Sequence, residues 1–228
     1  MSKRVLLIDH PVGHRDDRAS ARLAERGCRV QWCGPGKGEA LPEPDGFDAA
    51  VVYGGAESAN DDTTLPHIKA ELDWIGRWMN TGRPFLGLCL GGQLLARVLG
   101  AEVRLHREGL HEIGYTPIAP SDEAAGFVDG LSHVYHWHKE GFDLPAGAEL
   151  LARGPIFPNQ AFRYGDNVYA LQFHPEVSVP VMRRWMIEAA HMLESPGAHP
   201  PERQLADAAQ FDAPLEAWLN DFLDHWLE

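Results

Sequence analysis

The segment GLCLG, residues 87–91, places Cys89 between small residues where an apolar run meets a helical pattern. Residues 84–88 are predicted to form a buried strand, and the helix that follows them ends at Gly100. A cysteine at the turn between a strand and a helix has the form of a nucleophile elbow. The free N–H groups at the helix N-terminus would favour its thiolate. Taken alone, the segment fits a cysteine that merely packs in a glycine-rich turn equally well.

A second chemical group, the segment QFHPE at residues 172–176, follows a predicted strand over residues 168–172. A thiol nucleophile needs an imidazole to take its proton, and the imidazole needs a partner that fixes its tautomer. Residues i and i+2 of an extended segment lie on the same side, so His174 and Glu176 can meet. With Cys89 they would form a Cys-His-Glu triad.

The third group is Tyr53-Gly54-Gly55, which ends a strand predicted over residues 48–53. Acyl transfer needs N–H donors aimed at the developing oxyanion. The backbone N–H of Leu90 is one candidate, and the glycine loop offers another at the same edge of the sheet. From the glycines alone, an ordinary turn is the better interpretation.

The elements that must position these groups alternate along the first half of the chain. Four strands are predicted at residues 4–9, 28–33, 48–53 and 84–88, with helices over 15–26, 65–79 and 91–100. The second half contains short strands at residues 102–105, 112–118, 133–137, 150–153, 161–164 and 168–172, and then helices over 179–193 and 214–227. This order predicts an α/β fold, a flavodoxin-like three-layer sandwich with a mostly parallel central sheet and antiparallel additions. We expect one domain over residues 1–193 and a C-terminal helical extension over 194–228, packed on it.

Composition limits the classes of partner. The 228 residues are 44% hydrophobic and carry a net charge of −13. This charge argues against nucleic acid and against an anionic membrane surface as partners. No apolar stretch approaches the length of a membrane span. Three cysteines without regular spacing are not a disulfide framework, which favours the reducing cytoplasm.

The motif GLCLGGQLLA together with QFHPE resembles the class I, triad-type glutamine amidotransferase family. The likeness extends to YGGAES, HEIGYTPI and HVYHWHKEGFDLP, and it covers most of residues 5–187. Among subfamilies, the chain resembles stand-alone proteins related to the amidotransferase domain of GMP synthase. The resemblance implies a catalytic triad of Cys89, His174 and Glu176, and oxyanion donors at Gly55 and Leu90. It implies no cofactor, and it implies substrate contacts from Gly54, Gln93, His136, Trp137 and His138.

The implied reaction is hydrolysis of the side-chain amide of L-glutamine through a γ-glutamyl thioester on Cys89. No ATP-pyrophosphatase domain follows, so a synthetase on another chain is the expected recipient of the ammonia, and a homo-oligomer is also compatible with the sequence. Two other hypotheses stay open: a stand-alone γ-glutamyl peptidase or hydrolase, and an inactive regulatory module. One departure from the family is Ala56, where many members carry proline after the paired glycines.

Metal binding is the remaining question for the histidines. His133, His136 and His138 lie close together, and His106 and His111 precede them. A metal site needs three or four convergent ligands. Because no Cys, Asp or Glu stands at a supporting spacing, we expect no metal there.

Overall fold

The computed structural model describes residues 2–124 and 126–227. Its centre is an eight-stranded sheet in the order β2-β1-β3-β4-β12-β11-β10-β7. The first five strands in that order are parallel: β2 (Arg29–Cys33), β1 (Arg4–Ile8), β3 (Ala49–Val52), β4 (Phe85–Leu88) and β12 (Val168–Leu171). The last three are antiparallel: β11 (Ala161–Tyr164), β10 (Glu149–Arg153) and β7 (Ala119–Pro120). The predicted α/β sandwich is therefore confirmed.

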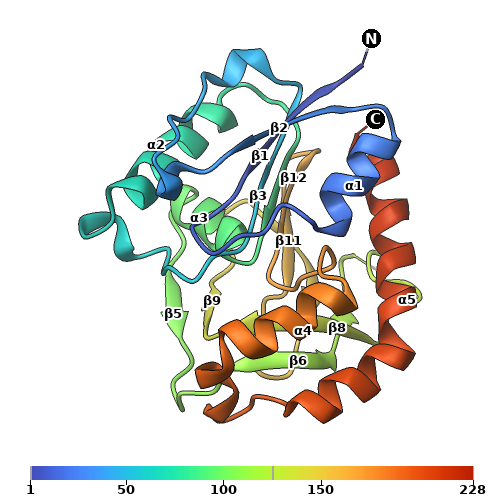
Figure 1. The fold of residues 1–228 in the computed structure, drawn as a ribbon. Helices are drawn as coiled ribbons and strands as arrows, with labels where there is room; N and C mark the ends of the chain where they lie inside the picture. Colours follow the sequence, from blue (N-terminus) through green and yellow to red (C-terminus); the bar gives the residue numbers. More distant parts are fainter. Residues whose placement is uncertain (1, 125, 228) are drawn as a thin grey trace.

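Helices cover both faces of this sheet (Figure 1). One face carries α2 (Pro66–Met79) and α3 (Leu90–Val98), and the other carries α1 (Arg18–Glu25), α4 (Val179–Glu188) and α5 (Pro201–Trp226). Alternate residues of a strand point to opposite faces. In β1, Leu6 packs with α2 and α3, whereas Val5 and Leu7 pack with α1 and α5. Both faces are buried, which explains why the strand sequence is continuously apolar.

The expectation that all the short strands join the core sheet is wrong in part. The strand β6 (Glu112–Pro117) pairs with β8 (His133–His138), and β5 (Val103–Leu105) pairs with β9 (Glu140–Phe142), as two separate two-stranded sheets. Both pairs are antiparallel, and their registers bring together segments that lie far apart in the sequence. The pair β6–β8 lies beyond the carboxyl end of the central sheet, under α4 (Figure 1).

The final helix is longer than predicted, because α5 begins at Pro201 and not at Pro214. A proline in the first turn of a helix costs nothing, since its missing N–H would have no intrahelical acceptor. The apolar side chains of α5 are buried against the rest of the domain, with Leu215 and Leu219 fully covered. Within the part of the chain that the structure describes, no helix is both long and apolar enough to cross a membrane.

Candidate active site

Cys89 occupies a strained turn between β4 and α3. Its backbone has φ 49° and ψ −107°, and it is the only non-glycine residue with positive φ among residues 2–124 and 126–227. Such a conformation is costly for a residue with a Cβ and persists only where its surroundings enforce it. Here the Cys89 N–H donates to the Leu171 carbonyl of β12 at 2.7 Å, and its own carbonyl accepts from Gln93 N at 3.0 Å. The predicted nucleophile elbow is present.

The glycines around the elbow let α3 approach the sheet. A Cβ on Gly91 would lie 2.0 Å from the Val52 carbonyl oxygen, and one on Gly87 would lie 2.6 Å from the Gly91 backbone. The Gly91 N–H also donates to the Tyr53 carbonyl at 3.2 Å. Small residues are therefore required here, and they place the glycine loop after β3 directly beside Cys89.

His174 and Glu176 form a buried pair at the end of β12. The Nδ1 atom of His174 lies 2.7 Å from Glu176 Oε1, and the two residues are 2% and 3% exposed. His174 is anchored through its backbone N–H, which donates to the Tyr135 carbonyl at 2.8 Å. A Cβ on Gly54 would lie 2.9 Å from His174 Cε1 and 3.4 Å from Cys89 Cβ, so the imidazole and the cysteine meet at this glycine.

The charge state of His174 follows from these neighbours. Burial acts to lower its pKa, but Glu176 and Cys89 outweigh burial and raise the pKa to about 10. Among the described residues, His174 Nε2 has no hydrogen-bond partner. One ring nitrogen is thus held by a carboxylate, and the other is free to exchange a proton. With a pKa of about 10 the ring is protonated at neutral pH, so it can stabilise a neighbouring thiolate and give its proton to a leaving group.

The glycine loop is held from behind by a second buried pair that sequence reasoning missed. His10 Nδ1 lies 3.0 Å from the Gly54 carbonyl oxygen, and His10 Nε2 lies 3.0 Å from Glu71 Oε2. Both side chains are fully buried. Burial acts to lower the pKa of His10, but the interaction with Glu71 raises it overall. A signal was available for His10, because it follows β1 at the sheet edge where α/β proteins place functional groups.

This pair sets the direction of the Gly55 N–H. In a trans peptide the C=O and N–H point in opposite directions. His10 draws the Gly54 carbonyl to one side, so the Gly55 N–H points to the other. The Leu90 N–H belongs to the first residue of α3 and has no acceptor within the helix. Both predicted oxyanion donors are therefore backbone groups next to Cys89.

Gln93 belongs to a chain of hydrogen bonds that ends at the sulfur. Its Nε2 atom donates to the Glu140 carbonyl at 2.8 Å and to Gln172 Oε1 at 3.2 Å. Gln172 Nε2 in turn lies 3.6 Å from Cys89 Sγ. Both N–H groups of Gln93 are thus used by the protein, which leaves its amide oxygen for a ligand. Gln172 received no role from the sequence, although it opens the QFHPE segment.

The structure separates the three residues of the HWH stretch. Side chains alternate along a strand, and His136 and His138 share one face of β8 with Glu112 of β6. Trp137 points to the other face, where its Nε1 lies 3.3 Å from Met192 Sδ. The expectation that no carboxylate supports these histidines is wrong, because the β6–β8 register places Glu112 opposite His138.

Glu112 is buried but well compensated. Burial acts to raise its pKa, but His136 and the hydrogen bond with His138 outweigh this effect and lower the pKa to about 2. For His136, burial dominates and lowers the pKa to about 3. The cluster therefore holds a carboxylate beside a neutral imidazole at neutral pH.

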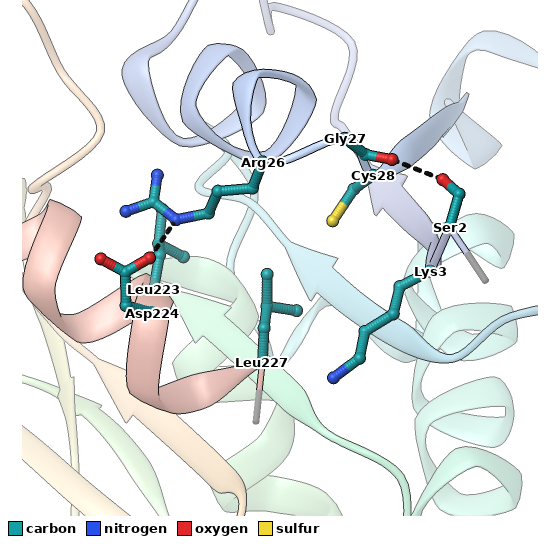
Figure 2. Close-up of a pocket in the computed structure, with 8 residues that line it drawn as sticks. All are labelled: Ser2, Lys3, Arg26, Gly27, Cys28, Leu223, Asp224 and Leu227. Carbon is teal, nitrogen blue, oxygen red and sulfur yellow. Dashed lines mark hydrogen bonds and ion pairs between the residues drawn. The ribbon is translucent and has the colours of Figure 1, made fainter.

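A surface hollow of about 320 Å³ lies at the other end of the molecule (Figure 2). Its lining includes Lys3 and Cys28, which precede β1 and β2, and the ion pair between Arg26 and Asp224 at 2.7 Å. Cys89 follows the carboxyl end of β4, and these strands are parallel. The hollow is therefore remote from Cys89, at the opposite edge of the sheet.

Fold and site together define an α/β protein with a cysteine nucleophile elbow and a buried imidazole–carboxylate pair. The sequence profile of the family "Glutamine amidotransferase class-I" matches residues 18–191. The glutamine amidotransferase-like protein YfeJ of Salmonella typhimurium is 34% identical over 165 residues, 68% of each chain. The chain belongs to the class I glutamine amidotransferase family.

Two further relatives place it within this family. A glutamine-hydrolyzing GMP synthase subunit of Sulfurisphaera tokodaii is 34% identical over 136 residues, which cover 58% of this chain and 68% of that one. The crystal structure of a glutamine amidotransferase from Thermotoga maritima matches with a TM-score of 0.89 and 30% identity, over 100% of this chain and 99% of that one. Relatives thus include glutaminase subunits of GMP synthase and amidotransferase-like proteins, as the resemblance implied.

Proposed function

We propose that this chain is a glutaminase whose nucleophile is Cys89. In the first half-reaction, the sulfur attacks the side-chain carbonyl carbon of L-glutamine. The C–N bond then breaks, His174 protonates the departing ammonia, and a γ-glutamyl thioester remains. In the second half-reaction, His174 takes a proton from water, the hydroxide attacks the thioester, and glutamate and the thiolate leave. The observation that carries this proposal is the meeting of the Cys89 elbow with the His174–Glu176 pair at Gly54.

The oxyanion of each tetrahedral intermediate would be bound by the N–H groups of Gly55 and Leu90. Donors that are oriented before the reaction contribute most, because they pay no reorganisation at the transition state. The hydrogen bond from His10 to the Gly54 carbonyl supports this role, since it fixes the peptide that carries the Gly55 N–H. The amide oxygen of Gln93 would accept from the amino group of the substrate, and the use of both Gln93 N–H groups by Glu140 and Gln172 supports this role.

The ammonia would pass to a synthetase on another chain. The similarity to a GMP synthase component that is named as glutamine-hydrolyzing supports this partner class.

All three cysteines are free in the structure, which supports the proposed cytoplasmic location.

The test is a glutaminase assay on the full chain. Ammonia and glutamate should appear in equal amounts from L-glutamine, with Cys89→Ser as the matched control that keeps the shape of the elbow. A glutamine-analogue diazoketone should label wild type with one adduct per chain, located on Cys89. Labelling without turnover would point to a site that needs its synthetase partner, and absence of both would contradict the proposal.

A panel of γ-glutamyl amides and peptides separates the proposal from a γ-glutamyl hydrolase. We expect kcat/KM for L-glutamine to exceed that for every conjugate. A conjugate that is turned over better would assign the site to γ-glutamyl hydrolysis, with the same Cys89 chemistry.

A further inference from the structure

The cluster of Glu112, His136 and His138 carries out no chemical step of the proposed reaction. Its three side chains are 0–4% exposed, and they lie on one face of the β6–β8 pair. The strand register places Glu112 opposite His138 and Gly114 opposite His136. Side chains at these positions share one face of the pair. Strand pairing alone therefore brings two imidazoles and a carboxylate to one buried point.

The facing atoms of the cluster form a small triangle. His136 Nδ1 lies 3.1 Å from His138 Nε2, His138 Nε2 lies 3.1 Å from Glu112 Oε2, and the third side measures 3.8 Å. A point equidistant from the three atoms lies about 2.0 Å from each, which is the length of zinc–nitrogen and zinc–oxygen bonds in proteins. One ion at this point would be at bonding distance from all three ligand atoms.

The hydrogen-bond pattern aims three ligand atoms at this point. His138 Nδ1 lies 2.9 Å from the Glu140 carbonyl oxygen. A carbonyl only accepts, so Nδ1 carries a proton, and Nε2 of the same ring faces the Glu112 carboxylate. A metal ion bound between them would replace any proton on Nε2, and Nδ1 of His136 would be its third ligand.

His138 and Glu112 have the outer-shell partners that a metal site shows, whereas Nε2 of His136 has no hydrogen-bond partner among the described residues. Metal-bound histidines usually donate their second N–H to a carbonyl, and metal-bound carboxylates are themselves hydrogen-bonded. His138 donates to Glu140 in this way. Glu112 accepts from Thr116 Oγ1 at 3.0 Å through Oε1 and from Gln160 Nε2 at 2.8 Å through Oε2.

We propose that Glu112, His136 and His138 bind one divalent transition-metal ion, of which zinc best suits two imidazoles and a carboxylate. The three protein ligands leave one position of a tetrahedral ion open, and the burial of the cluster points to a structural role. The Glu140 carbonyl accepts from both His138 at 2.9 Å and Gln93 at 2.8 Å. By holding His138, the ion would therefore also fix the Glu140 carbonyl, which accepts from Gln93. This site does not depend on the proposed glutaminase activity, and its test does not use turnover.

The test measures metal in the full chain, expressed in zinc-supplemented medium and dialysed against a metal-free buffer. We expect about one zinc per chain in wild type and less than about 0.1 in Glu112→Gln and His138→Asn. The matched control is His133→Asn. His133 lies on the same strand but stacks on Phe211 at 4.1 Å, outside the cluster, so this variant should keep its zinc.

A second measurement uses wild type alone, so misfolding of a variant cannot decide the result. Protein refolded without metal should gain thermal stability with Zn²⁺ or Co²⁺ but not with Mg²⁺, and the Co²⁺ form should show visible absorption bands. Wild type with less than about 0.1 zinc per chain and no response to either ion would overturn the proposal. Zinc that stays bound in Glu112→Gln and His138→Asn would overturn it as well, because the ion would then lie elsewhere.

Discussion

Two buried histidine–carboxylate pairs contact the same glycine loop, and they differ in whether the second ring nitrogen of the histidine has a hydrogen-bond partner. In the first pair, Glu176 holds His174 through Nδ1, and Nε2 has no hydrogen-bond partner within the described residues. In the second, both nitrogens of His10 are occupied, one by the Gly54 carbonyl and one by Glu71. The groups are chemically alike, but only the first has a ring nitrogen without a partner, through which it can exchange a proton with a neighbour.

The two glycines show how closely the pairs are fitted to the loop. A Cβ on Gly54 would lie 2.9 Å from Cε1 of His174, and a Cβ on Gly55 would lie 2.7 Å from Cγ of His10. Each glycine thus abuts one histidine. The unpartnered nitrogen of His174, next to Cys89, makes this residue the candidate for proton transfer. Both nitrogens of His10 are hydrogen-bonded, so we expect His10 to hold the glycine loop in position.

The largest expected effect is on the pair with the free nitrogen. His174→Gln removes the group that takes and returns the proton, so we expect kcat for glutamine hydrolysis to fall at least about 1,000-fold. The loss should persist across pH 6–9, since no other described group replaces this imidazole. Stopped ammonia assays measure the rate, and the thermal midpoint checks that the variant is folded. A folded variant with more than a tenth of wild-type kcat would remove His174 from the proposed mechanism.

The second pair should give a smaller effect of a different kind. His10→Gln loosens the peptide that carries the Gly55 N–H, and we expect kcat to fall by about 10- to 100-fold. This decrease is smaller than the one expected when an oxyanion donor is removed altogether. KM should change little, and the pH dependence of kcat should stay that of wild type, because His10 exchanges no proton with substrate.

A matched variant tests whether His10 acts by position or by charge. Glu71→Gln removes the negative charge that raises the pKa of His10, and the new amide NH₂ group can donate to Nε2 of a neutral His10. We expect it to retain more activity than His10→Gln, because a neutral imidazole can still donate from Nδ1 to the Gly54 carbonyl. If both variants lose stability but keep wild-type kcat in the folded fraction, the pair supports the fold and not the oxyanion loop.

The contact in the first pair could be predicted from the sequence, and the contact in the second pair could not. His174 and Glu176 lie two positions apart after an apolar strand, so local geometry was enough to predict their contact. His10 and Glu71 meet only because α2 packs against the face of the sheet where β1 ends. Glu112 is likewise brought to His138 by a strand pairing that sits outside the central sheet. Contacts between residues a few positions apart could be predicted from the sequence. Contacts formed by helix packing and by strand register could not.

The smallest expected effect concerns the carboxylate behind the first pair. Asp17 is the N-cap of α1, where its Oδ1 accepts from Ser20 N at 2.9 Å and from Tyr53 Oη at 3.0 Å. Burial raises its pKa from 3.8 to about 6, the hydrogen bonds from Ser20 oppose this effect, and the charge of Glu176 adds to it. An acid with a higher pKa in the folded state binds its proton more tightly there. The free energy of unfolding should therefore fall as pH rises from about 4 to about 6 and then level off.

Asp17→Asn removes this charge and keeps a good helix cap, since its amide oxygen can accept where Oδ1 does and its NH₂ group can donate to the Ser20 hydroxyl. We expect the variant to be more stable than wild type at pH 7.5 by about 1–2 kcal/mol, and the difference to vanish near pH 4, where the wild-type carboxyl is itself neutral. Urea unfolding at the two pH values measures this. If the variant is less stable at pH 7.5, the ionised carboxylate is held by its donors strongly enough to outweigh burial. The carboxylates around His174 would then act as one stabilised anionic group, and the electrostatic surroundings of His174 and His10 would be more alike.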